Sequence, residues 1–227
     1  MESNEEMRAG VRNYLQFLKD GGFLYLVPSS RKRQYSVHSR AECLAAEQKE
    51  ASTCTKCILS EQRTFVVFGE GNPDADLMFI GEAPGGDEDK QGRPFVGRAG
   101  KLLDSMMQQA GIQRRDVYIT NVVKCRPPGN RDPLPEEVEA CRPYLRGQIE
   151  LIEPKVIVAL GRFAAHSLAG NDTPIMKMRG RMFLFHNVKV MPTLHPAYIL
   201  RNMTQMELAL EDLRRAAEEA KRGGTRQ

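Results

Sequence analysis

Residues 81–100, GEAPGGDEDKQGRPFVGRAG, bring several chemically useful residue types into one short stretch. Its six glycines allow the backbone to approach a ligand closely, because no Cβ intervenes. The acids Glu82 and Glu88 could orient water or accept backbone N–H groups, and Phe95 could stack on a flat ring. We therefore expect a ligand site here, with a long connection carrying solvated acids as the alternative.

Two further segments carry polar residues that could act on the same ligand. Asn121 lies near the end of an apolar run at 117–123, and His195 follows another at 188–193. The carboxamide of Asn121 offers a donor and an acceptor, so it could read the edge of a base. His195 could donate a hydrogen bond to an oxygen that gains negative charge. A strand-end cap and a satisfied structural histidine are the respective alternatives.

Four of the five cysteines form a pattern typical of a metal site. Cys54 and Cys57 are a C-x2-C pair, and Cys125 and Cys141 follow later in the chain, whereas Cys43 does not fit the pattern and is interpreted as free. Four thiolates suit a tetrahedral zinc ion or a four-iron cluster, and their spacing does not separate the two. Cys141 could instead be a small core residue on an apolar helix face. The odd count without an export signal favours a cytoplasmic chain.

The elements that must position these residues alternate along the chain. Strands are predicted at 77–80, 117–123, 156–160 and 188–193, with helices between them and at about 205–222. This order predicts a parallel sheet with helices on both faces. The loops after the first, second and fourth strands would then share the carboxyl edge of the sheet, where such folds bind ligands. Residues 64–68 form an additional β-rich run.

Length and composition suit a globular protein with one main domain. The chain has 227 residues, 41% of them hydrophobic, and a net charge of +4, which is compatible with a polyanionic partner. No apolar run approaches the roughly 18 residues of a membrane span, so we expect no membrane association. Residues 1–50, with a possible helix at 1–20 and a basic run interpreted as a linker, are assigned to an N-terminal appendage. Residues 51–227 are assigned to the main domain.

Taken together, these motifs resemble a family 4 uracil-DNA glycosylase, the iron–sulfur type. The resemblance covers residues 54–213 and rests, in order, on GEAPGGDEDKQGRPFVG, TNVVKCRPPGNRDP, EEVEACRPYL, ALGRFAA, MRGR and LHPAYILR. It implies a three-layer α/β/α sandwich around a four-stranded parallel sheet. It also implies removal of uracil from DNA as the first step of base excision repair. A structural [4Fe-4S] cluster would be held by Cys54, Cys57, Cys125 and Cys141.

The resemblance assigns roles to the residues of the three loops. Phe95 would stack on a flipped uracil, Asn121 would pair with its O4 and N3–H, and His195 would donate to its O2. The loop glycines, among them Gly81, would let the backbone approach the base closely, and the backbone N–H groups of Glu82 and Ala83 would help to stabilise the developing anion.

The acid that positions the water is left open by the sequence. Ala83 stands where the family 1 enzymes carry an aspartate, so Glu82 and Glu88 are the candidates. We expect Glu82 to lie near the sugar and Glu88 to hold the loop. Further DNA contacts, including a wedge into the base stack at 198–201, are expected from six side chains: Arg98, Lys101, Arg179, Arg181, Tyr198 and Arg201.

The expected partner is uracil-containing DNA, bound by a monomer. Two alternatives remain from the sequence: a catalytically silent nucleic-acid-binding module with a structural metal site, and an enzyme of the family X type that crosslinks covalently to DNA. Family X members carry a KRRIH-type loop whose histidine attacks the sugar, whereas this chain reads MKMRGR there. A zinc hydrolase is a weaker alternative, because no histidine–carboxylate cluster is evident.

Overall fold

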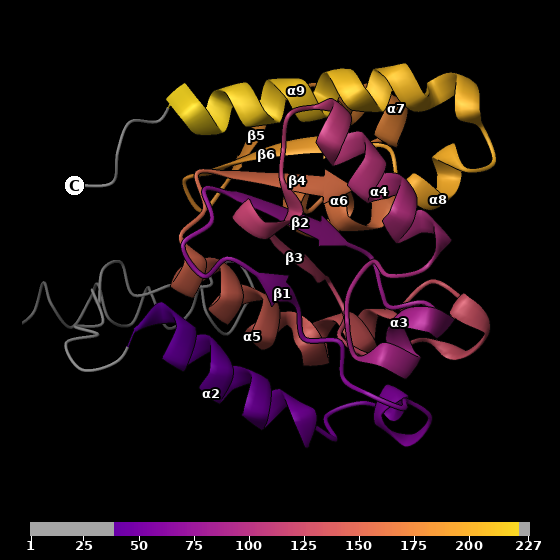
Figure 1. Cartoon of the computed structure of the whole chain (residues 1–227). Helices are drawn as coiled ribbons and strands as arrows, with labels where there is room; N and C mark the ends of the chain where they lie inside the picture. The colour runs from indigo at the N-terminus through magenta and orange to yellow at the C-terminus, as the bar shows by residue number, and fades with distance from the viewer. Residues whose placement is uncertain (1–38, 223–227) are drawn as a thin grey trace, which may run out of the picture. The chain divides into compact units, whose positions relative to one another are not determined.

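The computed structural model describes residues 39–222, which belong to one compact unit with an α/β fold. A six-stranded sheet with the order β1-β3-β2-β4-β6-β5 lies at its centre (Figure 1). The predicted helix at 1–20 and the basic run after it lie outside the described residues. The strands are β1 (Glu70–Gly71), β2 (Leu77–Gly81), β3 (Tyr118–Asn121), β4 (Val156–Leu160), β5 (Phe183–Phe185) and β6 (Val188–Thr193).

The sheet contains two more strands than the four expected. The four predicted strands are present as β3, β2, β4 and β6, and all of their pairings are parallel. β1 and β5 add antiparallel edges, and they comprise two and three residues. Elements this short show no periodicity from which to predict them. The β-rich run at 64–68 is not a strand, although Val67 N donates to Lys124 O at 2.8 Å.

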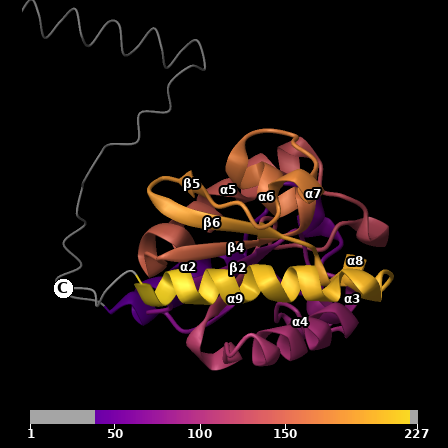
Figure 2. The ribbon, with the colours of Figure 1, turned by 90° about the horizontal axis from the view of Figure 1, so that it is seen from above.

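Helices cover both faces of the sheet, which gives three layers (Figure 2). α4 and α9 pack on one face, and α5 and α6 pack on the other, with α2 lying outside α5. The helices are α2 (Arg40–Ser52), α3 (Gly86–Gln91), α4 (Arg98–Gln109), α5 (Pro135–Ile152), α6 (Gly161–Ala169), α7 (Ile175–Met178), α8 (Pro196–Ile199) and α9 (Met206–Arg222).

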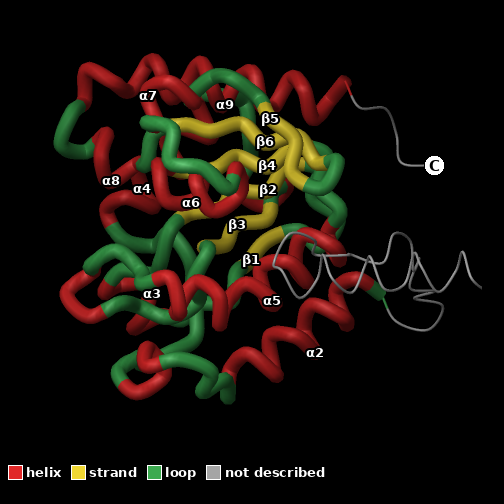
Figure 3. The backbone as a smooth tube through the Cα atoms, turned by 180° about the vertical axis from the view of Figure 1, so that it is seen from behind, coloured by secondary structure: helices red, strands yellow, loops and turns green. Residues whose placement is uncertain are grey.

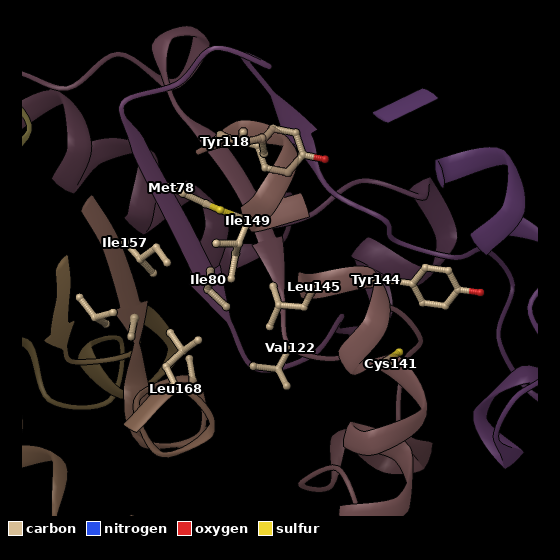
Figure 4. Close-up of a cluster of buried hydrophobic side chains, with 14 of the residues drawn as sticks. Met78, Ile80, Tyr118, Val122, Cys141, Tyr144, Leu145, Ile149, Ile157 and Leu168 are labelled. Carbon is tan, nitrogen blue, oxygen red and sulfur yellow. The ribbon is translucent and has the colours of Figure 1, made fainter. Parts of the chain in front are cut away.

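Each face of the sheet has its own hydrophobic core because side chains alternate along a strand. Met78 and Ile80 of β2 pack with Leu145 and Ile149 of α5 on one face (Figure 4). Phe79, between them in sequence, joins α4 and α9 on the other face. All five residues of β2 are buried, as expected for a strand covered on both sides.

α2 belongs to this compact unit, although the sequence analysis assigned it to the appendage. It begins with a capping box between Ser39 and Glu42, and its Leu44 and Ala51 side chains are buried. Arg40 donates to Ile152 O at 3.3 Å and so ties the start of α2 to the end of α5. The unit therefore starts at Ser39 instead of residue 51.

The loops that follow the parallel strands meet at one edge of the sheet. α3 and α8, which follow β2 and β6, both lie on the left side of the view in Figure 3. This is the carboxyl edge, where the sequence predicted the site. Within residues 39–222, every helix is too short or too polar to span a lipid bilayer.

Candidate active site

A cavity of about 640 Å³ opens at the carboxyl edge of the sheet. Its walls come from the loops after β2, β3, β4 and β6, and from α7. The structure brings together the side chains that the sequence singled out on three separate loops. These cavity-lining residues are Glu82, Ala83, Glu88, Phe95, Asn121 and His195.

Asn121 lies at the floor of the cavity, at the end of β3. Its side chain is 1% exposed, and its Oδ1 has no hydrogen-bond partner among the described residues. Gly81 is its neighbour on β2. A Cβ at Gly81 would lie 2.3 Å from Asn121 Oδ1 and 2.5 Å from Phe95 Cζ. Only glycine therefore lets the amide and the aromatic ring meet here.

A buried lysine, which the sequence analysis did not single out, binds the backbone of Asn121. Lys124 Nζ donates to Asn121 O at 2.7 Å, to Thr120 Oγ1 at 2.6 Å and to Gln148 Oε1 at 2.6 Å. Gln148 lies on α5, so the end of β3 is tied to the helix that covers it. A lysine in the basic sequence KCR suggests a solvent-facing cation, and its burial follows from this tertiary contact.

Phe95 forms a second wall of the cavity. Its ring lies 5.9 Å from the His195 ring between centroids, with 37° between their planes. The loop around it is held by Glu88, whose Oε1 accepts from Val96 N at 2.9 Å and from Gly97 N at 2.8 Å. The other oxygen, Oε2, accepts from Gly85 N at 3.1 Å. Glu88 thus uses both oxygens on the loop backbone.

His195 caps the N-terminus of α8 and faces the cavity. Its Nδ1 accepts a hydrogen bond from Ala197 N at 3.1 Å, which leaves Nε2 to carry the proton of the neutral ring. Burial, with a smaller effect of the nearby Arg201 charge, lowers the pKa of His195 from 6.5 to about 4. The imidazole is therefore neutral at pH 7 and can donate a hydrogen bond through Nε2.

Glu82 faces the cavity in a half-buried position. Burial is the main cause that raises its pKa above 4.5, and the negative charge of Asp132 adds to the effect. The Arg162 guanidinium opposes it, because a cation favours the charged carboxylate. Asp132 and Arg162 form an ion pair, and both line the cavity. The sequence analysis missed this pair, since Asp132 lies in the loop before α5 and Arg162 in the first turn of α6.

The side chains predicted to contact DNA divide into groups. Tyr198, which is 38% exposed, and Arg201 line the cavity mouth. Arg98 and Lys101 are exposed in the first turns of α4, and Arg181 is exposed before β5. These five side chains are accessible to a nucleic acid.

The structure corrects the expectation for Arg179, whose side chain is only 14% exposed. Its Nε and Nη2 donate to the two oxygens of Asp212 at 2.9 Å and 2.6 Å, and Nη2 also donates to Leu208 O at 2.6 Å. Asp212 accepts from Thr193 Oγ1 as well, at 2.7 Å. The guanidinium of Arg179 therefore anchors the segment after α7 to α9 instead of facing a phosphate.

The four patterned cysteines lie on three segments of one region. Cys125 follows β3, Cys141 lies on α5, and both are buried, whereas Cys54 and Cys57 after α2 are half-buried. Burial raises the pKa of Cys125 to about 11, and the neighbouring Cys141 and Cys57 also raise this pKa. Cys54 and Cys57 likewise raise the pKa of Cys141. The four thiols are thus close enough to influence one another.

Polar groups already surround these thiols. Arg63 Nη1 donates to Cys125 Sγ at 3.4 Å, and Lys124 N donates to Cys141 Sγ at 3.4 Å. Such donors stabilise thiolates. In residues 39–222, no three His, Cys, Asp or Glu side chains are close enough together to hold one metal ion. Cys43 lies on α2 and packs against the core.

Comparisons with known proteins agree with the resemblance. The model of the Uracil DNA glycosylase superfamily matches residues 68–219. The type-4 uracil-DNA glycosylase of Thermotoga maritima is 47% identical over 192 residues, which cover 83% of this chain and 100% of that protein. The type-4 enzyme of Archaeoglobus fulgidus is 50% identical over 160 residues, which cover 67% and 80%.

A less similar relative is a uracil-DNA glycosylase of another type. The type-5 uracil-DNA glycosylase of Pyrobaculum aerophilum is 35% identical over 172 residues, which cover 66% of this chain and 74% of that protein. The type-4 relatives are thus more similar to this chain, and the family predicted from the sequence is confirmed. The chain belongs to the uracil-DNA glycosylase superfamily and, within it, to the type-4 uracil-DNA glycosylases.

Proposed function

We propose that this chain binds a uracil nucleotide flipped out of DNA and hydrolyses its N-glycosidic bond in the cavity at the carboxyl edge of the sheet. One observation carries the proposal: a buried carboxamide, an aromatic ring and a neutral imidazole converge on this cavity. Flipping a base costs a few kcal/mol, which stacking and hydrogen bonds in the pocket must offset. The three side chains supply those interactions.

Asn121 reads the Watson–Crick edge of the base. Its Oδ1, which lacks a partner among residues 39–222, accepts from uracil N3–H, and its Nδ2 donates to uracil O4. Cytosine presents an acceptor and an amine at these positions, so both contacts would be mismatched. A buried amide whose donor and acceptor face the wrong partners costs more binding free energy than a merely weak contact. This cost discriminates against cytosine.

Phe95 and His195 contact different parts of the bound uracil, the face of the ring and the O2 atom respectively. The Phe95 ring stacks on the base, and Gly81 leaves the space that this requires. As the bond between N1 and the sugar breaks, negative charge builds up on uracil O2. The Nε2–H of neutral His195 donates to this oxygen without losing its proton.

Glu82 positions the water that attacks the sugar. Its carboxylate faces the cavity and stabilises the positive charge that develops on the sugar, whereas Glu88 holds the loop backbone. Water adds its oxygen to C1′ as the electron pair of the C1′–N1 bond leaves with uracil. Glu82 takes the water proton and passes it to solvent, and the uracil anion takes up a proton on release. The products are free uracil and an abasic site.

The DNA strand runs across the mouth of the cavity. Exposed Arg98 and Lys101 at the start of α4, together with Arg181, contact phosphates. Tyr198 and Arg201 occupy the rim, where the tyrosine ring can wedge into the space left by the flipped base. Arg162 is a further rim cation that the sequence analysis did not include.

Cys54, Cys57, Cys125 and Cys141 are proposed to hold a [4Fe-4S] cluster. Each thiolate of such a cluster binds a different iron, so the thiolates lie farther apart than around a single zinc ion. Four thiols on three segments, close enough for one to shift the pKa of another, supply the donor set that such a cluster requires. The bound group would supply a structural link between the segment after α2, the loop after β3 and α5.

Uracil release is the decisive test of the proposed function. A 5′-labelled oligonucleotide with one uracil is incubated with the protein, treated with alkali and analysed for strand breaks. Breakage at the uracil, and none with cytosine or thymine in its place, is expected. Intact strands would favour a silent DNA-binding module, and a protein–DNA adduct that survives denaturant would favour covalent attack on the sugar.

A further inference from the structure

Phe95 occupies a backbone conformation that non-glycine residues rarely adopt. Its φ of 52° lies in the left-handed region, where the Cβ crowds the backbone. Such a conformation persists only when surrounding contacts hold it. The contacts of this short loop therefore decide where the aromatic ring lies in the cavity.

The guanidinium of Arg114 binds the carbonyl groups of the two peptide units that flank the Phe95 Cα. Its Nη2 donates to Pro94 O at 2.7 Å, and its Nη1 donates to Phe95 O at 3.3 Å. Two carboxylates orient this guanidinium: Nη2 donates to Glu70 Oε1 at 2.7 Å, and Nη1 donates to Asp104 Oδ1 at 2.7 Å. Glu70 lies on β1 and Asp104 on α4, so Arg114 is fixed from two elements.

Glu88 binds the same loop through backbone N–H groups, on the C-terminal side of Phe95. It accepts from the N–H groups of Val96 and Gly97, while Arg114 donates to the carbonyl groups before them. Gly100 makes this close packing possible, since a Cβ there would lie 1.9 Å from Phe95 O. A cation and an anion therefore hold the backbone on either side of Phe95, and the residue cannot relax without breaking these bonds.

We propose that Arg114 is a positioning residue for uracil binding, which holds Phe95 in its left-handed conformation so that the ring forms a fixed stacking wall. The inference rests on the proposed function, because it concerns the same cavity. Without Arg114, the Phe95 backbone relaxes toward the common regions of φ, and the ring leaves its place above Gly81. Stacking is then lost, although Asn121 and His195 are untouched.

The test compares Arg114→Met with the matched control Arg93→Met in the full chain. Arg93 also binds Glu70, with Nε donating to Oε2 at 2.7 Å, and its side chain is 60% exposed. Among the described residues, Arg114 binds the loop carbonyls and Arg93 does not. The measurements are kcat and KM on a uracil oligonucleotide, the inhibition constant of free uracil, the affinity for an abasic-site oligonucleotide, and Tm.

Arg114→Met should weaken inhibition by free uracil and lower kcat/KM, each by about tenfold to a hundredfold, the loss expected when a base no longer stacks on an aromatic ring. Affinity for the abasic oligonucleotide should stay within about threefold of the unsubstituted protein, the range expected of a substitution that leaves the DNA contacts intact. Arg93→Met should change neither quantity. Equal losses in both variants, or an unchanged uracil inhibition constant in Arg114→Met, would overturn the proposal.

A double substitution tests whether Arg114 acts through Phe95. If it does, Arg114→Met adds little to the loss already caused by Phe95→Leu, whereas independent effects would multiply and refute the coupling. Should Arg114→Met fail to fold, Arg114→Lys replaces it, because a lysine keeps the charge without the planar fork that spans both carbonyls. Failure of both variants to fold would make Arg114 a residue of the fold and overturn the positioning role. Uracil release by the unsubstituted protein tests the proposed function separately.

Discussion

The two carboxylates of the glycine-rich loop have different surroundings, and this difference separates their roles. Glu88 accepts three backbone N–H groups and thereby fixes the loop. Glu82 faces the cavity, where burial and Asp132 make its charged form less favourable. A carboxylate with a raised pKa in a cavity is typical of a group that takes part in proton transfer.

The rate of uracil release should fall on the acid side because Glu82 becomes protonated. Its pKa is raised in the free enzyme, so the apparent pKa of this fall in kcat/KM should lie above 4.5. His195 stays neutral until about pH 4 and therefore does not set it. A pH–rate profile of Glu82→Gln should lack this step, whereas His195→Gln should lower the rate and leave the step in place. An acid step that shifts or disappears in His195→Gln would contradict its assignment to Glu82.

Asp132→Asn refines the same experiment. Asp132 raises the pKa of Glu82, so its neutralisation should shift the acid step to lower pH. Asp74→Asn, on the opposite edge of the sheet before β2, is the control and should leave the step unchanged.

Asn121→Ala should affect uracil excision far more than DNA binding. The substitution removes two hydrogen bonds to the base, so kcat/KM should fall by about a hundredfold or more. The affinity for an abasic-site oligonucleotide, which has no base to read, should change little. Asn171→Ala, an exposed carboxamide after α6, is the control. Parallel losses of activity and affinity would instead indicate a folding defect.

At the level of elements, the segment from β2 to α4 is shaped by hydrogen bonds from side chains. Glu88 lies in the first turn of α3 and closes a capping contact with Gly85 N. Asp89, beside it, is buried and accepts from Thr64 N at 2.9 Å and from Thr64 Oγ1 at 2.8 Å. Adjacent acids thus tie α3 to the site loop and to the segment that follows Cys57.

Glu88→Ala should therefore destabilise the protein and also lower the rate of uracil release. Loss of three charge-assisted bonds in a half-buried setting should lower the free energy of unfolding by about 2 kcal/mol. Asp87→Ala, the exposed neighbour in the same turn, should change it by less than about 0.5 kcal/mol. Urea unfolding curves give both values. Full stability in Glu88→Ala would show that the loop does not depend on this carboxylate.

The sequence predicts the long elements well and the short ones poorly. β4 and β6 have the predicted bounds: β4 is an apolar run buried on both faces, and β6 is buried over its last four residues. The edge strands β1 and β5 depend on pairing with a neighbour, which is a tertiary contact. Three features of the site also depend on tertiary contacts between residues far apart in the sequence, so the sequence does not predict them. They are the burial of Arg179 against Asp212, the Asp132–Arg162 pair and the contacts of Arg114.

On the scale of the whole molecule, the cysteine region and the cavity share the loop after β3. Asn121 ends β3, and Cys125 follows it by a few residues, with Lys124 between them bonded to Asn121 O and to Cys141 Sγ. A group bound by the cysteines would therefore stabilise the strand end that carries the base reader. Metal binding of this kind contributes directly to folding stability.

Substitution of the patterned cysteines tests that contribution. Serine at Cys54, Cys57, Cys125 or Cys141 should abolish the visible absorbance near about 400 nm that an iron–sulfur chromophore gives, and should lower Tm. Cys43→Ser should preserve both, because Cys43 is a half-buried residue of α2 that packs against the edge of the core and does not belong to the proposed ligand set. A colourless unsubstituted protein containing stoichiometric zinc would replace the cluster with a zinc site. Bleaching by Cys43→Ser would show that the ligand set is wrong.

The lone oxygen of Asn121 also has a thermodynamic consequence for the empty enzyme. Asn121 Oδ1 has no hydrogen-bond partner within residues 39–222, so this buried acceptor is left for the base and adds no hydrogen bond among those residues. Free uracil at about a hundred times its Kd should stabilise the protein by about 2.7 kcal/mol, measurable as a rise in Tm. Asn121→Leu, of similar volume, should melt at a higher temperature than the empty parent protein and no longer respond to uracil. Specificity for the base is thus maintained at the expense of heat resistance in the free enzyme.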